Sequence, residues 1–285
     1  MQANAKHIAI VSNVLAGAGR AITLAQKIAE ELSNKQIFHS FFKENWPADF
    51  NEFTDIWIVG GDGTLNYFVN QYHDIKLPLV IFNGGTGNDF HWLLYGKISF
   101  EEQLQLALSA EPKPIDLGRC NEFFFINGVG VGFEGEVARS LTGKKKRAGK
   151  ASFMAMILQK IFSYRSTSYR ISTAEQSIAL KKYLIIDVSN GSRAGGGFHV
   201  APHAKANDGL FDITLIDALH PLRRLRWLPV IEKGKHLNLS FVHHFTSKQI
   251  LIESDESILF HLDGEYYEAP QLNVSMLPRQ LLFRY

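Results

Sequence analysis

The sequence predicts an α/β domain with a parallel sheet, followed by a β-rich domain. Strand and helix signals alternate in the first part of the chain, and β-forming runs dominate after about residue 114. The chain has 285 residues with 46% hydrophobic content, which is enough for two cores. We therefore expect the first domain to span residues 1–114 and the second to span residues 115–277. The sequence leaves open that residues from about 278 to 285 return to the first domain.

The elements of the first domain are predicted by short apolar runs and by helical periodicity. Apolar runs predict strands at residues 7–11, 37–41, 56–59 and 79–82. Helical spacing of apolar residues predicts helices at 20–32, 65–72 and 100–108. Strands that alternate with helices are typical of βαβ units, so we expect a parallel sheet.

The second domain is predicted by clusters of β-forming residues with turn residues between them. Strands are expected at 178–188, 211–216, 249–253, 258–262 and 272–276. Two segments with a helical pattern interrupt them, at 150–162 and 221–236. This sequence pattern is typical of an antiparallel, mostly β region.

Composition limits the classes of function. The net charge of +2 gives no support for a nucleic-acid partner, and we expect none. Cys120 is the only cysteine, so an intrachain disulfide is excluded and a cytoplasmic location is favoured. No apolar run reaches the roughly 18 residues that a membrane span needs. The apolar segment 8–18 contains polar residues and is interpreted as a strand, a loop and the start of a helix rather than as a signal peptide.

Two glycine-rich loops follow neighbouring predicted strands and are the strongest functional signal. Residues 60–66 read GGDGTLN, and residues 84–89 read GGTGND. In open α/β sheets, ligands bind at the carboxyl ends of the strands. Glycines allow the backbone to approach a phosphate, and Thr64 and Thr86 add hydroxyl donors. One such loop alone could be an ordinary tight turn, but two together predict a nucleoside triphosphate site, although the usual P-loop pattern is absent.

Acidic residues suggest further chemistry at three places. Asp62 can hold a metal or accept a proton. Residues 208–212 (DGLFD) are either a β-turn or an oxygen-rich loop for Mg²⁺. Residues 262–265 (LDGE) are either a hairpin turn or, functionally, a general base or a metal-holding pair. A GxGxxG pattern at 130–135 lacks the acidic residue that a dinucleotide site requires, so we interpret it as coincidental.

One stretch of the second domain is basic throughout. Residues 137–174 contain nine lysines and arginines and no acidic residue, with an apolar run inside. This pattern is either a solvated basic face or a surface that docks on anionic lipid. The residues that we expect to contact a membrane are Lys144, Lys145, Lys146, Arg147 and Lys150.

In the order of its motifs, the chain resembles the bacterial diacylglycerol kinase and lipid kinase family, whose catalytic domain is shared with sphingosine and ceramide kinases. The resemblance covers nearly the whole chain. It rests on the two glycine loops, on segments 127–133 and 146–150, on Gly195–Gly197 followed by Ala201 and Pro202, and on the DGLFD and DGE motifs. The first loop by itself also looks like NAD kinases and 6-phosphofructokinases.

The resemblance implies an NAD kinase-like nucleotide domain, a β-sandwich-like second domain, and the cofactors ATP and Mg²⁺. The residues expected to contact ATP are Asn13, Gly60, Gly61, Asp62, Gly63, Thr64, Leu65, Asn66, Gly85, Thr86, Gly87 and Asn88. Glu265 matches the family's proton acceptor, and Lys205, Asp208 and Leu210 match its structural Mg²⁺ loop. One departure is that the loop after the first strand keeps Asn13 and its glycines but lacks the family's proline.

The expected function is therefore phosphoryl transfer from ATP to the hydroxyl of a membrane lipid, most simply diacylglycerol. Catalysis is assigned to Glu265, Asp62 and Asp263: Asp62 and Asp263 hold Mg²⁺, and Glu265 accepts the proton, with Asp62 as the rival for that role. We expect peripheral association with the inner face of the membrane, and the sequence leaves open a homodimer. The alternatives are a kinase of a soluble substrate and a nucleotide or lipid sensor without catalysis.

Overall fold

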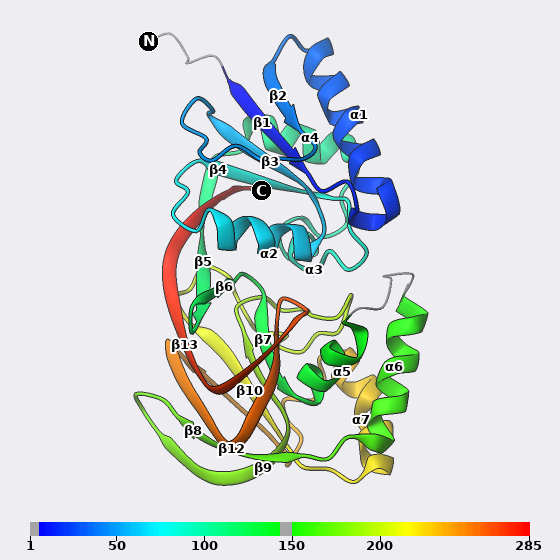
Figure 1. Cartoon of the computed structure of the whole chain (residues 1–285), viewed down its shortest axis with the longest axis vertical. Helices are drawn as coiled ribbons and strands as arrows, with labels where there is room; N and C mark the ends of the chain where they lie inside the picture. Colours follow the sequence, from blue (N-terminus) through cyan, green and yellow to red (C-terminus); the bar gives the residue numbers. More distant parts are fainter. Residues whose placement is uncertain (1–5, 143–149) are drawn as a thin grey trace. The chain divides into compact units, whose positions relative to one another are not determined.

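The computed structural model describes residues 6–142 and 150–285 (Figure 1). The chain divides into two compact units. The N-terminal unit comprises Met1–Ile115 and Arg279–Tyr285, and the C-terminal unit comprises Asp116–Pro278. Two strands have residues in both units, β5 (Pro112–Cys120) and β13 (Glu265–Arg284).

The N-terminal unit is built on a parallel sheet in the order β2-β1-β3-β4. Its strands are β1 (His7–Ser12), β2 (Phe38–Phe42), β3 (Asp55–Gly60) and β4 (Pro78–Asn83). Its helices are η1 (Ala16–Gly19), α1 (Arg20–Asn34), α2 (Asp62–Gln71), α3 (Asp89–Tyr95) and α4 (Phe100–Ser109). The α/β fold with a parallel sheet is therefore confirmed.

Alternating residues of the sheet make the core of this unit. Every second residue of β1, β3 and β4 packs against α1 and α4, as the two-residue period of a strand requires. The buried members of this cluster are Ile8, Ile10, Ala21, Ala25, Ile28, Leu32, Trp57, Val59, Val80, Phe82, Leu104 and Ala107. Helix α1 begins at Arg20 as predicted, and α4 begins with a capping box between Ser99 and Glu102.

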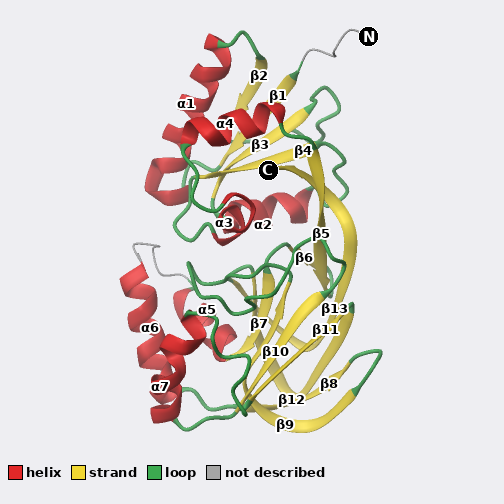
Figure 2. Cartoon of the chain, turned by 180° about the vertical axis from the view of Figure 1, so that it is seen from behind, coloured by secondary structure: helices red, strands yellow, loops and turns green. Residues whose placement is uncertain are grey.

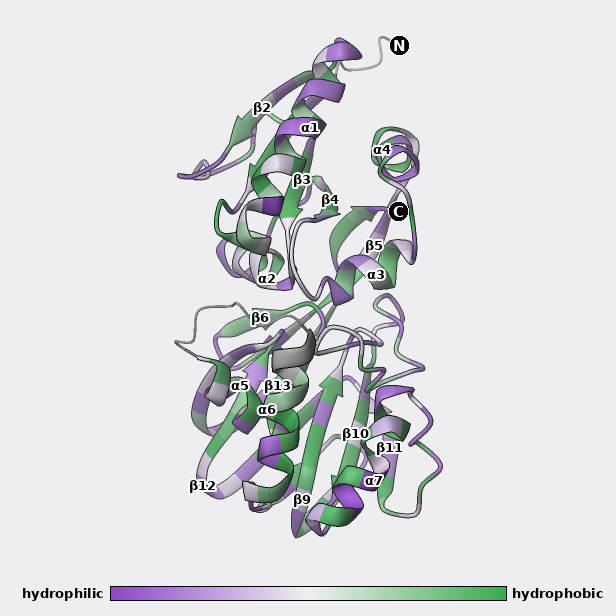
Figure 3. Ribbon diagram, turned by 90° about the vertical axis from the view of Figure 1, so that its right-hand side faces the viewer, coloured by the Kyte–Doolittle hydropathy of each residue, from purple (hydrophilic) through white to green (hydrophobic). Residues whose placement is uncertain are grey.

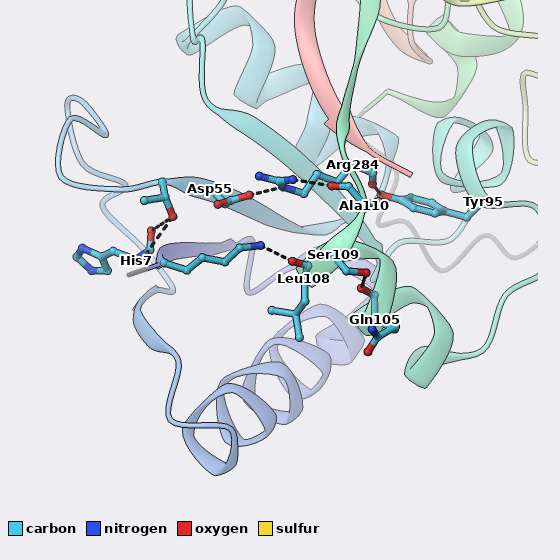
Figure 4. A network of polar contacts seen from close by, with 10 residues as sticks. His7, Asp55, Tyr95, Gln105, Leu108, Ser109, Ala110 and Arg284 are labelled. Atoms are coloured by element: carbon cyan, nitrogen blue, oxygen red, sulfur yellow. Dashed lines mark hydrogen bonds and ion pairs between the residues drawn. The ribbon is translucent and has the colours of Figure 1, made fainter. Parts of the chain in front are cut away.

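The end of the chain completes the N-terminal unit. The last residues of β13 pair in parallel with β4. Arg284 donates to the buried carboxylate of Asp55 at 2.5 Å and to the carbonyl of Ala110 at 2.5 Å, and Tyr95 donates to the carbonyl of Arg284 at 2.7 Å (Figure 4). Because Asp55 is 1% exposed, the guanidinium supplies the partner that a buried carboxylate needs.

The C-terminal unit is built on an antiparallel sheet with the strand order β11-β10-β9-β7-β12-β13. It contains the residues of β5 from Asp116 onward and the residues of β13 up to Pro278. Its other strands are β6 (Phe123–Phe125), β7 (Gly128–Gly132), β8 (Thr167–Ser172), β9 (Ser177–Ser189), β10 (Phe211–Asp217), β11 (Val242–Ser247) and β12 (Gln249–Leu262). One apolar cluster draws residues from β5 through β13 and forms the core between the strands. The prediction of a β-rich second region is thus confirmed.

Three helices lie on one side of these strands, as Figures 1 and 2 both show. They are α5 (Phe133–Leu141), α6 (Lys150–Ser163) and α7 (Pro221–Glu232). They share a second apolar cluster with Leu184 and Ile185 in the middle of β9 and with Phe198 and Val200.

Several predicted element bounds need correction. The expected strands 249–253 and 258–262 form one strand, β12, whose register shifts between Glu253 and Ile258. The expected strand 272–276 is only the middle of β13, a strand of 20 residues that contains two prolines. The helix expected at 221–236 ends at Glu232, because Gly234 adopts a φ of +67° just beyond it.

Candidate nucleotide and catalytic site

The first glycine loop is a direct transition from strand to helix. Strand β3 ends at Gly60, and α2 begins at Asp62 with Gly61 as its N-cap. The N–H groups of Thr64 and Leu65 donate to the carbonyl of Gly61 at 3.0 and 3.1 Å. The helix thus begins two residues after the strand, three residues earlier than predicted. The start of a ten-residue helix directly after a strand is a favourable place for an anionic group.

The two glycine loops contact each other backbone to backbone. A Cβ at Gly85 would lie 2.3 Å from the Cα of Gly61, and a Cβ at Gly61 would lie 2.8 Å from the Cα of Gly85. Neither position has room for a side chain, which explains why the chain has glycine at both. The predicted convergence of the two loops at one edge of the sheet is therefore present in the structure.

Side chains at the ends of these loops are used differently. Thr64 and Asn66 are buried, at 4% and 5% exposure, whereas Thr86 and Gly87 are exposed. Asn88 adopts a φ of +55°, and its side-chain oxygen accepts the N–H of Gly85 at 2.9 Å, which closes the second loop. The exposed Thr86 hydroxyl and the loop backbone are therefore the groups that can reach a bound phosphate.

Asp62 links the two loops. Its two carboxylate oxygens accept the N–H groups of Asp89 and Phe90, each at 3.1 Å, at the start of α3. The carboxylate thereby stabilises the first turn of that helix. Each oxygen keeps a second lone pair, so the assignment of Asp62 as a metal ligand stays a prediction alongside this structural role.

A third loop approaches the same edge of the sheet, and only its residue Asn13 was predicted from the sequence. Asn13 forms a turn after β1 by accepting the N–H of Leu15 at 2.9 Å. At Gly17, whose φ is +59°, a Cβ would lie 2.1 Å from the carbonyl oxygen of Gly84. Arg20 donates to the carbonyls of Gly17 at 3.1 Å and Gly85 at 2.6 Å. Arg20 was not predicted, because nothing in its local sequence separates it from any other first residue of a helix.

The DGE motif is a two-residue hairpin turn between β12 and β13. Asp263 and Gly264 have φ values of +50° and +89°, and Leu262 pairs with Glu265. The Asp263 carboxylate accepts three backbone N–H groups, those of Ile126, Asn127 and Gly128, at 2.8–2.9 Å. Asp263 thus attaches the hairpin to the start of β7. Its predicted part in holding a metal is untested, and three donors leave it little acceptor capacity.

Glu265 is the first residue of β13, directly after this turn, and is half-buried. The three hydrogen bonds of Asp263 fix the backbone two residues before it. A proton acceptor needs such positioning, because its carboxylate must lie within hydrogen-bond reach of the group that loses the proton.

A group of ionisable residues around Gly130, with Asp187 buried and Glu134 and His261 partly buried, was missed by the sequence analysis. Gly130 of β7 pairs with Asp187 of β9 on one side and with His261 of β12 on the other. A Cβ at Gly130 would lie 2.2 Å from Oε2 of Glu134 and 2.3 Å from Nε2 of His261. The GxGxxG pattern interpreted as coincidental therefore has a steric reason at its first glycine.

His261 connects this group to the DGE turn. Its Nδ1 accepts the N–H of Gly264 at 3.3 Å, and its Nε2 lies 3.8 Å from Glu134 Oε2. Burial lowers the pKa of His261 to about 4, so the imidazole is neutral at pH 7. Burial likewise raises the pKa of Asp187 to about 7, and burial together with the neighbouring Asp187 raises the pKa of Glu134 well above its usual range.

The DGLFD motif forms a turn at the start of β10. Asp208 accepts the N–H of Leu210 at 3.1 Å, and the buried Asp116 accepts the N–H of Gly209 at 2.7 Å. Lys205 and Asp208 are exposed, and Leu210 is half-buried. Within residues 6–142 and 150–285, no three His, Cys, Asp or Glu side chains are grouped so that they could hold a metal. A cation here would need backbone carbonyls with the Asp208 carboxylate, which is the oxygen donor set that Mg²⁺ accepts.

The predicted membrane-contact residues are placed only in part. Lys144, Lys145, Lys146 and Arg147 lie outside the described residues. Lys150 is the first residue of α6. In the part of the chain that the structure describes, no helix is both long and apolar enough to span a bilayer.

Comparison with known proteins assigns both halves of the chain. Residues 7–120 match the diacylglycerol kinase catalytic domain, and residues 127–283 match the YegS C-terminal NAD kinase β-sandwich-like domain. The chain belongs to this family of lipid kinases. The expected fold and the expected enzyme class, a kinase, are thereby confirmed.

Relatives within the lipid kinase family agree with this assignment. A probable lipid kinase YegS-like of Shewanella frigidimarina is 30% identical over 79% of this chain and 74% of its own length. The diacylglycerol kinase of Bacillus subtilis is 28% identical over 77% of this chain and 73% of its own length. The crystal structure of a diacylglycerol kinase-like protein from Bacillus anthracis has the same fold, with a TM-score of 0.79, 22% identity and coverage of 100% of this chain and 97% of that one. Membership of a kinase family implies ATP as the phosphoryl donor.

Proposed function

We propose that this lipid kinase transfers the γ-phosphoryl group of ATP to the hydroxyl of a membrane lipid, diacylglycerol or a related lipid alcohol. The observation that carries the proposal is the pair of glycine loops, whose backbones touch at Gly61 and Gly85 and leave Thr86 exposed beside them. Such an arrangement binds phosphate through backbone N–H groups rather than through a P-loop lysine.

In the proposed reaction, the acceptor hydroxyl oxygen forms a bond to the γ-phosphorus while the bond from that phosphorus to the β–γ bridging oxygen breaks. ADP leaves with the electron pair, and the hydroxyl proton passes to the Glu265 carboxylate. Asp62 is the alternative acceptor. Mg²⁺, when bound, would neutralise charge on the phosphates, and Asp62 or the Asp208 loop with the carbonyls of Lys205 and Leu210 would supply its oxygen ligands.

The test is transfer of labelled phosphate from γ-labelled ATP, with Mg²⁺, into a lipid extract in mixed micelles, resolved by thin-layer chromatography. We expect a labelled lipid whose mobility identifies the acceptor. Glu265→Gln should abolish the spot, and Glu268→Gln, an exposed glutamate on the same strand, should retain it. Label in a water-soluble product, or no transfer despite ATP binding, would contradict the proposal.

We also propose that the basic segment around Lys144–Lys150 brings the enzyme to anionic membrane. Each basic residue near such a surface contributes about 1 kcal/mol. Replacing Lys144, Lys145, Lys146 and Arg147 with glutamine should reduce activity on anionic vesicles and preserve activity on a short-chain acceptor in solution. Equal loss on both substrates would reject this role.

A further inference from the structure

Helix α7 presents an apolar and basic outer surface that the function described so far does not use. Leu222 is 63% exposed and Leu225 is 40% exposed. Arg223 and Arg226 are also exposed. Residues three apart in a helix lie on the same side, so the two leucines and the two arginines form adjacent rows. We call these four residues the α7 outer face.

The orientation of this face is fixed by Arg224, which is buried. Its guanidinium donates to the carbonyls of Leu219 at 2.7 Å, Ile161 at 3.0 Å and Tyr164 at 2.8 Å. With Arg224 and Ile231 directed inward, the residues on either side of Arg224 are directed outward. The α7 outer face is therefore a consequence of how the helix packs and not of a loosely held segment.

The same contacts hold the end of α6 beside α7, and Figure 2 shows the two helices next to each other. There, Phe162 is 58% exposed and Leu158 is 39% exposed, one turn apart. Four of the large apolar side chains that the described residues expose thus lie on these two neighbouring helices. Figure 3 shows hydrophobic and hydrophilic residues alternating along α7.

Basic residues outnumber acidic ones on these helices. Helix α7 has three arginines and one acidic residue, Glu232, which is its last residue, and α6 has no acidic residue. The Arg223 guanidinium lies over the Phe241 ring at 5.3 Å, and that of Arg226 lies over the Trp227 ring at 5.2 Å. These contacts keep the cations close to the surface, beside the exposed leucines.

We propose that the α7 outer face docks on an anionic lipid surface. Exposed leucines flanked by arginines, with a tryptophan beside them and the only acidic residue of α7 at its last position, have the composition of helices that lie in the membrane interface. The proposal rests on the proposed function in one respect, since a lipid kinase must reach an acceptor that resides in a bilayer. It uses no residue of the segment Lys144–Lys150, and it is built only from described residues.

The test is cosedimentation of the full chain, without ATP, with vesicles of phosphatidylglycerol and phosphatidylcholine in equal parts and with vesicles of phosphatidylcholine alone. Arg223→Gln with Arg226→Gln should weaken binding to the anionic vesicles about 25-fold, or about fivefold for each charge. Leu222→Ser with Leu225→Ser should weaken it about tenfold. Both pairs are exposed, and unchanged thermal unfolding would confirm that each variant folds.

The matched control is Leu180→Ser, which changes a 45% exposed leucine of β9 beside Lys181 and Lys182. This variant should bind vesicles as the wild type does. The proposal is overturned if the wild type does not bind anionic vesicles, if it binds neutral ones equally well, or if the α7 variants bind like the wild type. Equal loss in Leu180→Ser would also overturn it, because binding would then be unspecific.

Two further readouts separate this proposal from others. If the α7 variants convert a dimer to a monomer in light scattering, the face joins two copies of the chain and the lipid proposal is wrong. Phosphate transfer to a short-chain acceptor in solution should be unchanged in the α7 variants. If the wild type transfers no phosphate to that acceptor, the proposed function fails, whatever the vesicles show.

Discussion

The two units share one structural feature, an aspartate that accepts backbone N–H groups, but the surroundings of that aspartate differ between them. Asp62 in the N-terminal unit accepts two N–H groups at 3.1 Å and joins two glycine loops. Asp263 in the C-terminal unit accepts three at 2.8–2.9 Å and joins a hairpin to β7. Near Asp62, the backbones of the two glycine loops pack against each other. Near Asp263, the ionisable side chains of His261, Glu134 and Asp187 lie around Gly130.

This difference determines which perturbation each region is sensitive to. The glycine loops have no room for an added side-chain atom, so a methyl group should disturb them at any pH. Around Gly130, the ionisable side chains lie in an interior of low dielectric constant, where a charged form is unfavourable. A change of pH should therefore disturb this region without any change of volume. Three predictions test this contrast, starting with the largest effect.

The first prediction concerns Asp187→Asn. In the wild type, the pKa of Asp187 is raised from 3.8 to about 7, so the stability that its protonated form contributes is complete below pH 4 and is lost as the pH rises through 7. The asparagine does not ionise and can still accept the hydroxyl of Ser189. The variant should therefore gain free energy of unfolding relative to the wild type, by up to about 4 kcal/mol between pH 4 and pH 8.

Urea unfolding of both proteins at several pH values measures this difference. His261 has a lowered pKa, so its neutral form contributes stability above pH 6.5 that is lost as the pH falls toward 4, but this contribution is present in both proteins and cancels. A difference that does not change with pH would show that Asp187 ionises normally.

The second prediction compares the two anchors directly. Asp263→Asn replaces an acceptor of three hydrogen bonds and should lower the free energy of unfolding by about 3 kcal/mol. Asp62→Asn affects two longer bonds and should cost about 1 to 2 kcal/mol. Chemical denaturation at pH 7 measures both, and a larger loss for Asp62→Asn would reverse the ranking of the anchors.

The third prediction concerns Gly85→Ala. The added methyl group would lie 2.3 Å from the Cα of Gly61, and backbone cannot move aside as a flexible side chain can. Overpacking of this kind costs about 2 kcal/mol. If this free energy distorts only the ATP-binding loops, the affinity for ATP should fall about 30-fold. Titration calorimetry with ATP measures the affinity at pH 6 and pH 8, and a loss present at only one pH would contradict a steric cause.

The sequence predicted the fold class because periodicity reports burial. Four strands and three helices of the N-terminal unit were expected close to their observed bounds, since each has an apolar run or an apolar helical period in its sequence. Helix α3 was not predicted, because its start depends on the carboxylate of Asp62, 27 residues earlier in the chain. Strand β13 was only partly predicted, because its prolines and exposed residues interrupt the apolar pattern of the sequence. The strand is continuous in the structure because it pairs with neighbouring strands such as β12.

The candidate site was predicted where glycine and acidic residues are adjacent in sequence and missed where contacts are long-range. The two glycine loops and the DGE turn were identified from local patterns. Arg20, Asp116 and the group around Gly130 were not, since each acquires its partners only when distant strands or loops meet. The roles assigned to Asp62, Asp263 and Glu265 stay predictions that activity measurements must decide.

The central claim is that the glycine loops bind ATP and Glu265 accepts the proton. Its most direct test is one experiment on Glu265→Gln that measures both the dissociation constant for ATP and the rate of phosphate transfer in a single turnover. If the glycine loops bind the nucleotide and Glu265 accepts the proton, ATP should bind with an affinity within about twofold of the wild type, and transfer should slow by about 100-fold or more. A transfer rate equal to that of the wild type would show that Glu265 is not the proton acceptor.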